Sequence, residues 1–133
     1  MTTIPAHLPH RPPLLLVDRV LDRDPGVRVV AEKLLAAGDP CLRGAPGGRV
    51  PGPLLVEMLA QASAFLEEGS LHGAQVFLAA IPEARFQAPA GAGDRLRLEV
   101  HRAGAFGGLT KLEGTATCGG RTCCTATLLV KRT

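Results

Sequence analysis

The chain has 133 residues, of which 46% are hydrophobic and 20% charged, and its formal net charge is +3. This size and balance predict one folded domain over residues 1–133 with a core of its own, rather than a disordered chain. Phe is the only aromatic residue type, with four copies. So few stacking side chains, together with a mild charge, argue against nucleic-acid binding.

No apolar run approaches the roughly 18 residues that a membrane span requires, so we expect no membrane insertion. Residues 1–5 show no basic region followed by an apolar stretch, and we expect a cytoplasmic protein without a signal peptide. The cysteines have neither metal-binding nor disulfide spacing: Cys41, Cys118, Cys123 and Cys124. Adjacent strand side chains point to opposite faces, so the last two would not easily share an ion. We interpret all four as free thiols that pack as small hydrophobes.

Two strands are expected near the beginning of the chain. The first covers residues 14–21, and the second covers residues 27–35, after the turn signal Asp24-Pro25-Gly26. A loop rich in Gly and Pro follows over residues 38–52 and leads directly into a helix. Together the two strands predict a hairpin ahead of that helix.

The helix is predicted to begin at Gly52-Pro53, because a Pro in the first turn has no N–H that needs a partner. It should end near residues 67–69, where Gly69 can adopt a left-handed cap. Its residues are apolar almost all round, which is typical of a helix surrounded by protein. Glu57 and Gln61 interrupt this pattern four residues apart and therefore lie one above the other. A buried carboxylate needs compensation, either in a structural network or in an active site, and both readings stay open on this pattern alone.

Strands dominate the rest of the sequence. Residues 75–86 predict a strand bent at Pro82, as at a sheet edge or bulge. Residues 90–94 form a turn signal, and the following residues alternate between apolar and polar as in a half-buried strand. Residues 109–118 and 122–130 are joined by Gly119-Gly120, a tight hairpin signal. One long helix followed by antiparallel strands predicts an α+β domain with the helix packed on a sheet.

The order of these segments and several short sequence motifs resemble those of proteins with the hot-dog fold. Within that fold they resemble the FabZ-type 3-hydroxyacyl-[acyl-carrier-protein] dehydratases of bacterial fatty-acid synthesis. The resemblance covers nearly the whole chain. Its motifs are residues 8–20 (LPHRPPLLLVDRV), Pro51-Gly52 with Glu57 and Ala60-Gln61, Ala84-Arg85-Phe86 with Pro89, Gly93-Asp94-Arg95-Leu96 and Gly114-Thr115-Ala116-Thr117. The resemblance implies an antiparallel sheet wrapped around one long central helix.

The resemblance also implies a chemistry, the removal of water from a 3-hydroxyacyl thioester. In the family a helix-borne Glu acts on the leaving hydroxyl, and a loop His takes the proton next to the thioester carbonyl. Glu57 matches this Glu and is the candidate catalytic residue. Gly52 and Pro53, at the helix start, and Gln61, as a partner that orients Glu57 or caps a backbone group, are the candidate binding residues. No metal and no cofactor are expected.

The resemblance implies a partner and an assembly as well. The substrate would be a thioester of acyl carrier protein or coenzyme A, and a mildly positive surface suits either acidic partner. Because the family's sites form between two subunits, we expect a homodimer or a higher oligomer.

The sequence departs from the family in one place. The family's loop carries Gly-His-Phe-Pro-Gly, whereas residues 44–52 (GAPGGRVPG) contain no His and are about two residues shorter. Four hypotheses follow: a dehydratase with a substitute base, an acyl thioesterase using Glu57 and water, a non-catalytic acyl-thioester-binding subunit, or a mixed dimer in which an active dehydratase supplies the His. The other histidines are expected to be structural or solvated: His7, His10, His72 and His101. The His7-x-x-His10 spacing is a poor metal motif.

Overall fold

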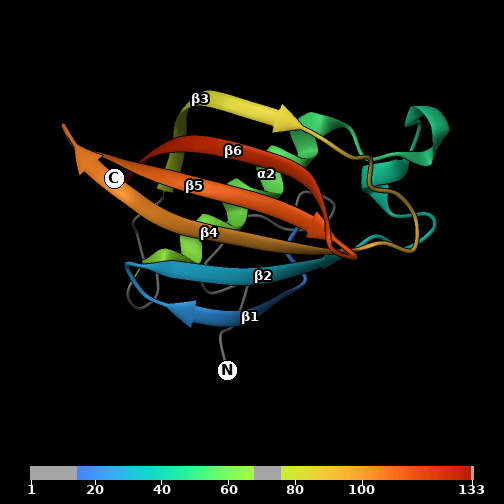
Figure 1. Cartoon of the computed structure of the whole chain (residues 1–133), viewed down its shortest axis with the longest axis horizontal. Coiled ribbons are helices and arrows are strands. Elements are labelled where there is room, and N and C mark those ends of the chain that lie inside the picture. The colour runs from blue at the N-terminus through green and yellow to red at the C-terminus, as the bar shows by residue number, and fades with distance from the viewer. Residues whose placement is uncertain (1–14, 68–75, 133) are drawn as a thin grey trace.

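The computed structural model describes residues 15–67 and 76–132. Its six strands form one antiparallel sheet in the order β1-β2-β4-β5-β6-β3, and the sheet curves around helix α2 (Figure 1). The strands are β1 (Arg19–Asp24), β2 (Arg28–Leu34), β3 (Val76–Phe86), β4 (Arg95–Phe106), β5 (Leu109–Cys118) and β6 (Arg121–Arg132), and α2 covers Gly52–Ser63. This is the arrangement that the hot-dog resemblance implies. No helix in the described part of the chain is long and apolar enough to cross a membrane.

The predicted first hairpin is present, but its first strand begins later than expected. The backbone turns at residues 24–27, where the Val27 N–H donates to the Asp24 carbonyl (3.0 Å) and Gly26 has a φ of +78°. The apolar residues Leu16 and Val17 precede β1 and are buried in the core. The predicted strand followed the apolar residues, whereas the residues that pair with β2 are the more polar residues 19–24.

The helix begins where predicted and loses α-helical geometry earlier than expected. After Ser63 the chain continues as the 3₁₀ turn η3 (Ala64–Leu66), and Glu67 is already extended. The Ser63 hydroxyl donates to the Ala60 carbonyl (2.6 Å), and a 3₁₀ turn is a common way to satisfy the last carbonyls. Arg23 of β1 also donates to the Phe65 and Glu67 carbonyls. The expected cap, Gly69, lies outside the described residues.

The helix is not covered all round by the described residues, contrary to the expectation from its composition. Leu55, Met58, Leu59 and Ala62 are buried against the sheet, whereas a stripe at helical spacing stays partly open: Pro53, Leu54, Glu57 and Ala60. Helical periodicity therefore separates a core-facing side from an open side that carries Glu57.

The later strands follow the sequence pattern closely. β3 is an edge strand whose register against β6 shifts between Ala80 and Glu83, at the expected bend around Pro82. The β5–β6 turn uses Gly119 and Gly120, with φ values of +54° and +82°. The register between β5 and β6 shifts after Ala116: Ala116 pairs with Cys124 and Thr117 with Thr122, so Cys123 is the extra residue of a bulge in β6. Because of this bulge Cys123 and Cys124 are both buried, rather than one inside and one outside.

The helix approaches the sheet closely at one glycine. A Cβ added at Gly114 of β5 would lie 3.2 Å from Leu59 Cδ1 and 3.4 Å from Leu59 Cβ. Gly104 of β4 follows a register shift, but it has open space around its Cβ position and its φ is not positive.

We therefore expect Gly114→Val to lower the free energy of unfolding by about 1–3 kcal/mol, because the added atoms overpack the contact with Leu59. Gly104→Val is the matched control and should change stability by less than ~0.5 kcal/mol or raise it, since Val suits a strand. Urea unfolding of both variants measures the difference. Equal effects at the two positions would contradict this account of the helix–sheet contact.

Candidate active site

Glu57 and Gln61 lie one helical turn apart on α2 and contact each other as predicted. Gln61 Nε2 donates to Glu57 Oε1 (3.2 Å). Gln61 is almost fully buried, with 2% of its surface exposed, whereas Glu57 is half-buried on the open side of the helix. A buried amide that holds a partly accessible carboxylate suits a group that must meet a substrate.

The other end of the Gln61 amide is fixed by the backbone. The Leu16 N–H donates to Gln61 Oε1 (2.8 Å), so the segment before β1 determines which amide atom faces Glu57. Gln61 thus accepts from a backbone N–H and donates to Glu57, and its role in orienting Glu57 stays a prediction. The sequence gives no signal for Leu16 as the partner, because 45 residues separate the two.

The start of α2 lies next to the end of β3. Helix α2 begins after Pro51, and Pro53 sits in its first turn. A Cβ added at Gly52 would lie 2.9 Å from the ring of Phe86, so a side chain at this position would displace that exposed ring. Twelve helical residues direct a partial positive charge toward this end, which suits a developing oxyanion.

The loop before α2 is held against the turn that precedes β4. Arg49 and Gly91 form an isolated β-bridge, and the Val50 N–H donates to the Ala90 carbonyl (2.8 Å). A Cβ at Gly91 would lie 2.8 Å from the Gly48 carbonyl oxygen. Gly91 therefore permits a close approach between the backbone of this turn and the backbone of the loop.

A buried ion pair anchors the beginning of this loop, and sequence reasoning missed it. Lys33 Nζ lies 3.0 Å from Asp39 Oδ2 and 3.7 Å from Asp18 Oδ1, and the Cys41 N–H donates to Asp39 Oδ1 (3.0 Å). Burial alone would raise the pKa of Asp39, but the Cys41 N–H and the Lys33 ammonium hold it below its ordinary value. The Asp39-Pro40 pair, a helix-start signal, was the available clue.

The cysteine in the loop is not an activated nucleophile. Burial, and next the hydrogen bond with Asp39, raise the pKa of the Cys41 thiol to about 11. Burial likewise raises the pKa of Cys124 to about 11. Both thiols stay protonated at neutral pH, and the thiolate is the reactive form.

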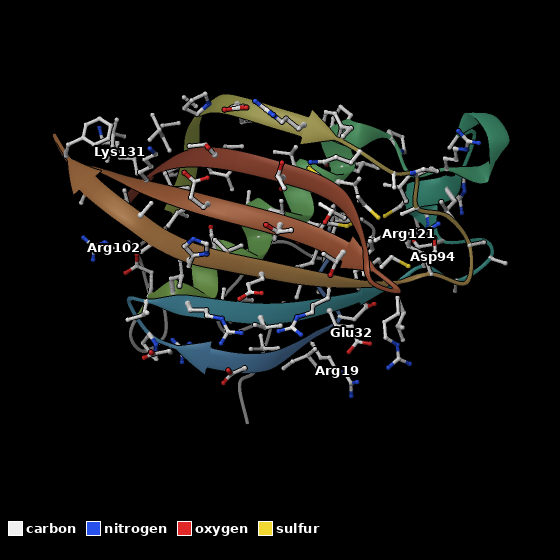
Figure 2. The ribbon with its side chains drawn as sticks, viewed as in Figure 1. Arg19, Glu32, Asp94, Arg102, Arg121 and Lys131 are labelled. Atoms are coloured by element: carbon white, nitrogen blue, oxygen red, sulfur yellow. The ribbon has the colours of Figure 1, made fainter. Side chains whose placement is uncertain are left out.

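Among the described residues the most buried carboxylate is Glu32 rather than Glu57. Glu32 is 2% exposed and lies between two arginines on the outer face of the sheet, with Arg19 Nε at 2.7 Å and Arg95 Nε at 3.0 Å (Figure 2). A buried charge with two cationic partners is a structural network. Glu32 is therefore a buried carboxylate held by ion pairs, and the two readings of Glu57 are not decided by it.

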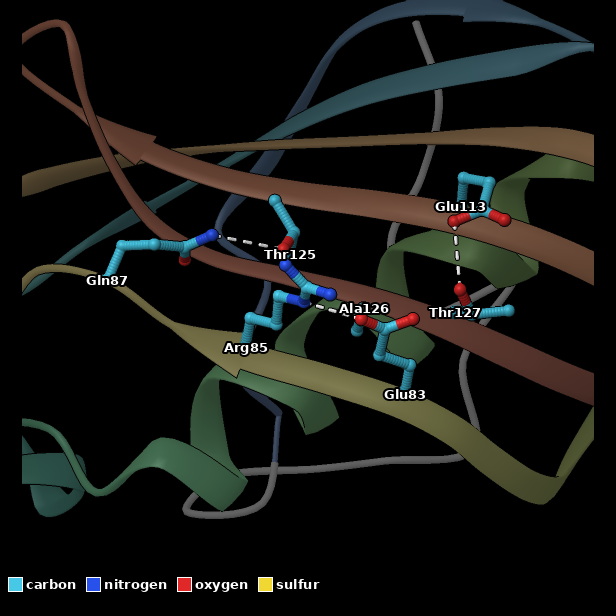
Figure 3. Close-up of a pocket in the computed structure, with 7 residues that line it drawn as sticks. All are labelled: Glu83, Arg85, Gln87, Glu113, Thr125, Ala126 and Thr127. Carbon is cyan, nitrogen blue, oxygen red and sulfur yellow. Dashed lines mark hydrogen bonds and ion pairs between the residues drawn. The ribbon is translucent and has the colours of Figure 1, made fainter.

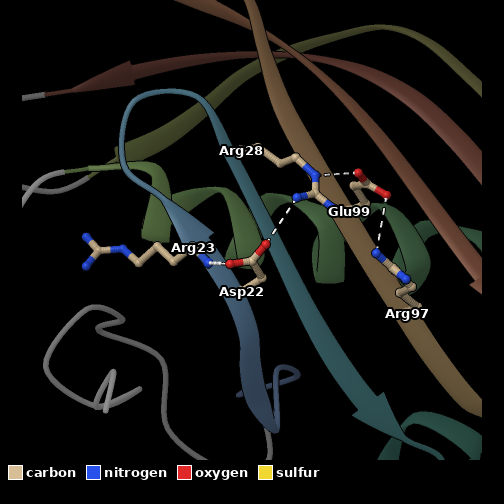
Figure 4. Close-up of polar contacts among 5 residues, drawn as sticks. All are labelled: Asp22, Arg23, Arg28, Arg97 and Glu99. Carbon is tan, nitrogen blue, oxygen red and sulfur yellow. Dashed lines mark hydrogen bonds and ion pairs between the residues drawn. The ribbon is translucent and has the colours of Figure 1, made fainter.

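His101 is the histidine within the described residues, and it lies on the far side of the sheet from α2. It is exposed and pairs in register with Arg28 and Glu113. The neighbouring charges satisfy one another: Arg28 Nε lies 2.6 Å from Glu99, and the hydrogen bond lowers the pKa of Glu99 (Figure 4). His7, His10 and His72 lie outside the described residues. His101 is therefore solvated, as expected, and is separated from Glu57 by the sheet.

The same outer face carries a shallow polar hollow of about 290 Å³ between β3, β5 and β6 (Figure 3). Arg85 pairs with Glu83 there, and Thr127 Oγ1 donates to Glu113 Oε2 (3.0 Å). These residues lie across the sheet from Glu57. No group of three or more His, Cys, Asp or Glu side chains in the described part of the chain could hold a metal ion.

Comparison with known proteins decides the family. Residues 8–127 match the FabA-like domain. The FabZ 3-hydroxyacyl-[acyl-carrier-protein] dehydratase of Roseiflexus sp. is 42% identical over 95% of this chain and 91% of its own length. That of Variovorax paradoxus is 40% identical over 96% and 93%. The chain belongs to the FabZ-type dehydratase family.

Solved structures confirm the hot-dog fold. A dehydratase heterocomplex, ApeI:P from Xenorhabdus doucetiae, superposes with a TM-score of 0.83 at 20% identity, over 100% of this chain and 92% of the other. A hypothetical thioesterase with coenzyme A from Streptococcus pneumoniae gives a TM-score of 0.70 at 15% identity, over 86% and 84%. At these identities the likeness concerns the fold.

The buried ion pair gives a pH-dependent prediction. Because the folded pKa of Asp39 is depressed, the carboxylate stabilises the fold above its unfolded pKa, near 4, and this contribution is lost as the pH falls through the lower folded pKa. Asp39→Asn should lower the free energy of unfolding by about 1–3 kcal/mol at pH 7, because it leaves Lys33 poorly paired. The difference from wild type should shrink below pH 4.

Asp22→Asn is the control, because Asp22 pairs with Arg28 at 3.2 Å but is 66% exposed. It should cost less than ~1 kcal/mol. Urea titrations at pH 7 and pH 3.5 check both variants. A constant difference between Asp39→Asn and wild type at the two pH values would contradict the assignment.

Proposed function

We propose that this chain is the carboxylate-bearing subunit of a FabZ-type 3-hydroxyacyl-thioester dehydratase assembly, in which a different subunit supplies the base. The observation that carries the proposal is the Glu57–Gln61 pair, on the helix that follows a loop without histidine. The whole chain, residues 1–133, would act as one hot-dog domain.

The proposed reaction converts a 3-hydroxyacyl thioester into the 2-enoyl thioester and water. The partner's base takes a proton from the carbon next to the thioester carbonyl, and that electron pair forms the new double bond. Glu57, in its protonated form, gives its proton to the leaving hydroxyl, which departs as water. The positive end of α2 at Gly52 and Pro53 would stabilise the charge that develops on the thioester oxygen.

The base is assigned to a second subunit because the described part of this chain offers none near Glu57. The loop arginines Arg43 and Arg49 stay protonated at ordinary pH, Cys41 is held as a thiol, and His101 lies across the sheet. A family site shared between two subunits lets one subunit contribute the carboxylate and the other the base. The ApeI:P heterocomplex is a structural precedent for dehydratase subunits that assemble as unlike partners.

Strand β3 is the surface that we propose for this assembly, either with an unlike subunit or with a second copy. It is an edge strand of the sheet, and several of its large apolar side chains are exposed: Phe77, Leu78, Ile81 and Phe86. An edge with open backbone groups and exposed apolar side chains favours pairing with another strand. Phe86 also packs beside Gly52, which places this edge next to the start of α2.

The first test uses the chain alone and in a mixture, with enoyl product and free thiol followed together on a 3-hydroxyacyl thioester. Alone, the chain should turn over 10²–10⁴-fold more slowly than an active FabZ-type enzyme, because general acid–base catalysis contributes about that factor. Mixed with an active dehydratase whose own helix Glu is replaced by Gln, it should restore enoyl formation. The chain with Glu57→Gln should not.

Glu113→Gln is the matched control, because Glu113 lies on the outer face of the sheet, and it should restore activity as wild type does. Each other outcome contradicts the proposal in a distinct way. Enoyl product from the chain alone that is lost in Glu57→Gln would mean that it holds its own base. Free thiol alone would identify a thioesterase. Tight acyl-thioester binding that Glu57→Gln leaves unchanged, without restored activity, would identify a binding subunit.

An acidic carrier protein is the proposed form of the substrate, because arginines surround the loop beside the helix start. Arg43 and Arg49 are exposed in the loop. Arg121 lies 3.7 Å from Asp94, whose carboxylate accepts from the Gly91 N–H beside Arg49. We call Arg43, Arg49 and Arg121 the loop-end arginines; such a cluster attracts an acidic partner.

We expect Arg49→Glu together with Arg121→Glu to weaken binding to acyl carrier protein by about tenfold or more, and the difference to narrow at 0.5 M salt, because surface charges are screened. Arg102→Glu, at the other end of the sheet, should leave the affinity within twofold. Surface plasmon resonance with immobilised carrier protein measures all three. If Arg102→Glu lowered the affinity for acyl carrier protein as much as the double change does, the loss would be due to net charge alone and the proposed contact would be wrong.

A further inference from the structure

One carboxylate fixes the turn that precedes β4. Asp94 Oδ2 accepts from the Gly91 N–H (2.9 Å), and the Asp94 N–H donates to the Gly91 carbonyl (3.0 Å). Short polar side chains commonly hold a turn by bonding its backbone in this way. Leu35, just after β2, accepts from the Gly93 N–H and donates to the Asp94 carbonyl. The turn is thus tied to the end of β2, and within it Asp94 holds Gly91.

Gly91 is also the residue on which the loop before α2 rests. It forms the isolated bridge with Arg49. Next to it, the Ala90 carbonyl accepts from the Val50 N–H (2.8 Å). Val50 is followed by one residue before Gly52, where α2 begins. A displacement of Gly91 would therefore reach the start of the helix over a very short stretch of backbone.

The Asp94 carboxylate is charged where it holds Gly91. The hydrogen bond from the Gly91 N–H lowers the pKa of Asp94 most; burial opposes this, and the Cys118 thiol and Arg121 lower the pKa further. Arg121 lies 3.7 Å away, and the two side chains meet at the loop end of the sheet (Figure 2). A hydrogen bond to an ionised acceptor is stronger than one to a neutral group. Gly91 is therefore held by a charge-assisted hydrogen bond.

We infer that Asp94 is a positioning residue for the proposed dehydration: it holds Gly91, and through Gly91 the loop that leads into α2. The thioester oxygen would lie at Gly52 and Pro53, and a displacement of about 1 Å in a reacting geometry can cost roughly 10²-fold in rate. Asp94 acts through the backbone rather than on the substrate. The effect on catalysis rests on the proposed function, whereas the hold on the loop does not.

Amide hydrogen exchange of the full chain tests the hold on the loop. Asp94→Ala should speed exchange of the Val50 N–H about tenfold or more, because losing a hydrogen bond to a charged group frees Gly91 and with it the Val50–Ala90 bond. The amides of β4 and β5 should exchange within about twofold of wild type, because the opening is local. Asp94→Asn keeps an oxygen that can accept from Gly91, so its effect should be smaller.

Asp22→Ala is the matched control. The Asp22 carboxylate also accepts a backbone N–H, from Arg23 (2.9 Å), and also meets an arginine, Arg28 at 3.2 Å. It lies on β1 and contacts neither the turn nor the loop. Asp22→Ala should therefore leave exchange of the Val50 N–H within about twofold of wild type.

The effect on catalysis is measured in the mixture with the active dehydratase whose helix Glu is replaced by Gln. Asp94→Ala should lower kcat for enoyl formation about tenfold or more, while KM for the acyl-carrier substrate stays within about threefold. Asp94→Asn should lose less than Asp94→Ala, and Asp22→Ala should stay within about twofold of wild type. Rates are compared at equal concentrations of folded chain, verified by circular dichroism.

Each other outcome overturns a defined part of this inference. Unchanged exchange of the Val50 N–H in Asp94→Ala would show that Asp94 does not hold the loop. Exchange that rises equally throughout the sheet would make Asp94 a stabilising turn residue and nothing more. A loosened loop with unchanged kcat would remove the effect on catalysis and leave the proposed function intact. If the wild-type chain restores no enoyl formation, the proposed function fails instead, and exchange alone decides whether Asp94 holds the loop.

Discussion

The side-chain amide of Gln61 is the interaction on which the candidate site depends. It accepts a hydrogen bond from the Leu16 backbone on one side and donates to Glu57 on the other. An amide has a distinct donor end and acceptor end, so the backbone contact determines which atom meets the carboxylate. The segment before β1, the middle of α2 and the orientation of Glu57 are therefore coupled through one buried group.

Two glycines allow the helix and the sheet to pack closely around this site. Gly114 lets Leu59 approach β5, and Gly52 lets the Phe86 ring lie against the start of α2. The loop between β2 and α2 is fixed at its beginning by the Lys33–Asp39 pair and at its end by the bridge between Arg49 and Gly91. A site between a helix start and a loop needs both ends of the loop to be held, because small displacements there change the reaction geometry.

Charge is distributed unevenly between the two ends of the sheet and its outer face. On the outer face most charges neutralise one another, as in the Arg28–Glu99 pair and the buried Glu32 between Arg19 and Arg95. Cations with few partners are left at the two ends, near the loop and near the β4–β5 turn.

The sequence by itself determined the elements and the family. Strand alternation, Pro53 at the helix start, Pro82 at an edge and glycine turns are local signals, and the chain's own neighbours produce them. The spacing of Glu57 and Gln61 likewise predicted their contact. Only the tertiary structure decided that Glu57 is half-open while Glu32 is the buried carboxylate, because burial depends on which strand packs against which. The Lys33–Asp39 pair and the Leu16 contact also arise from the fold, since they join residues whose meeting no local pattern encodes.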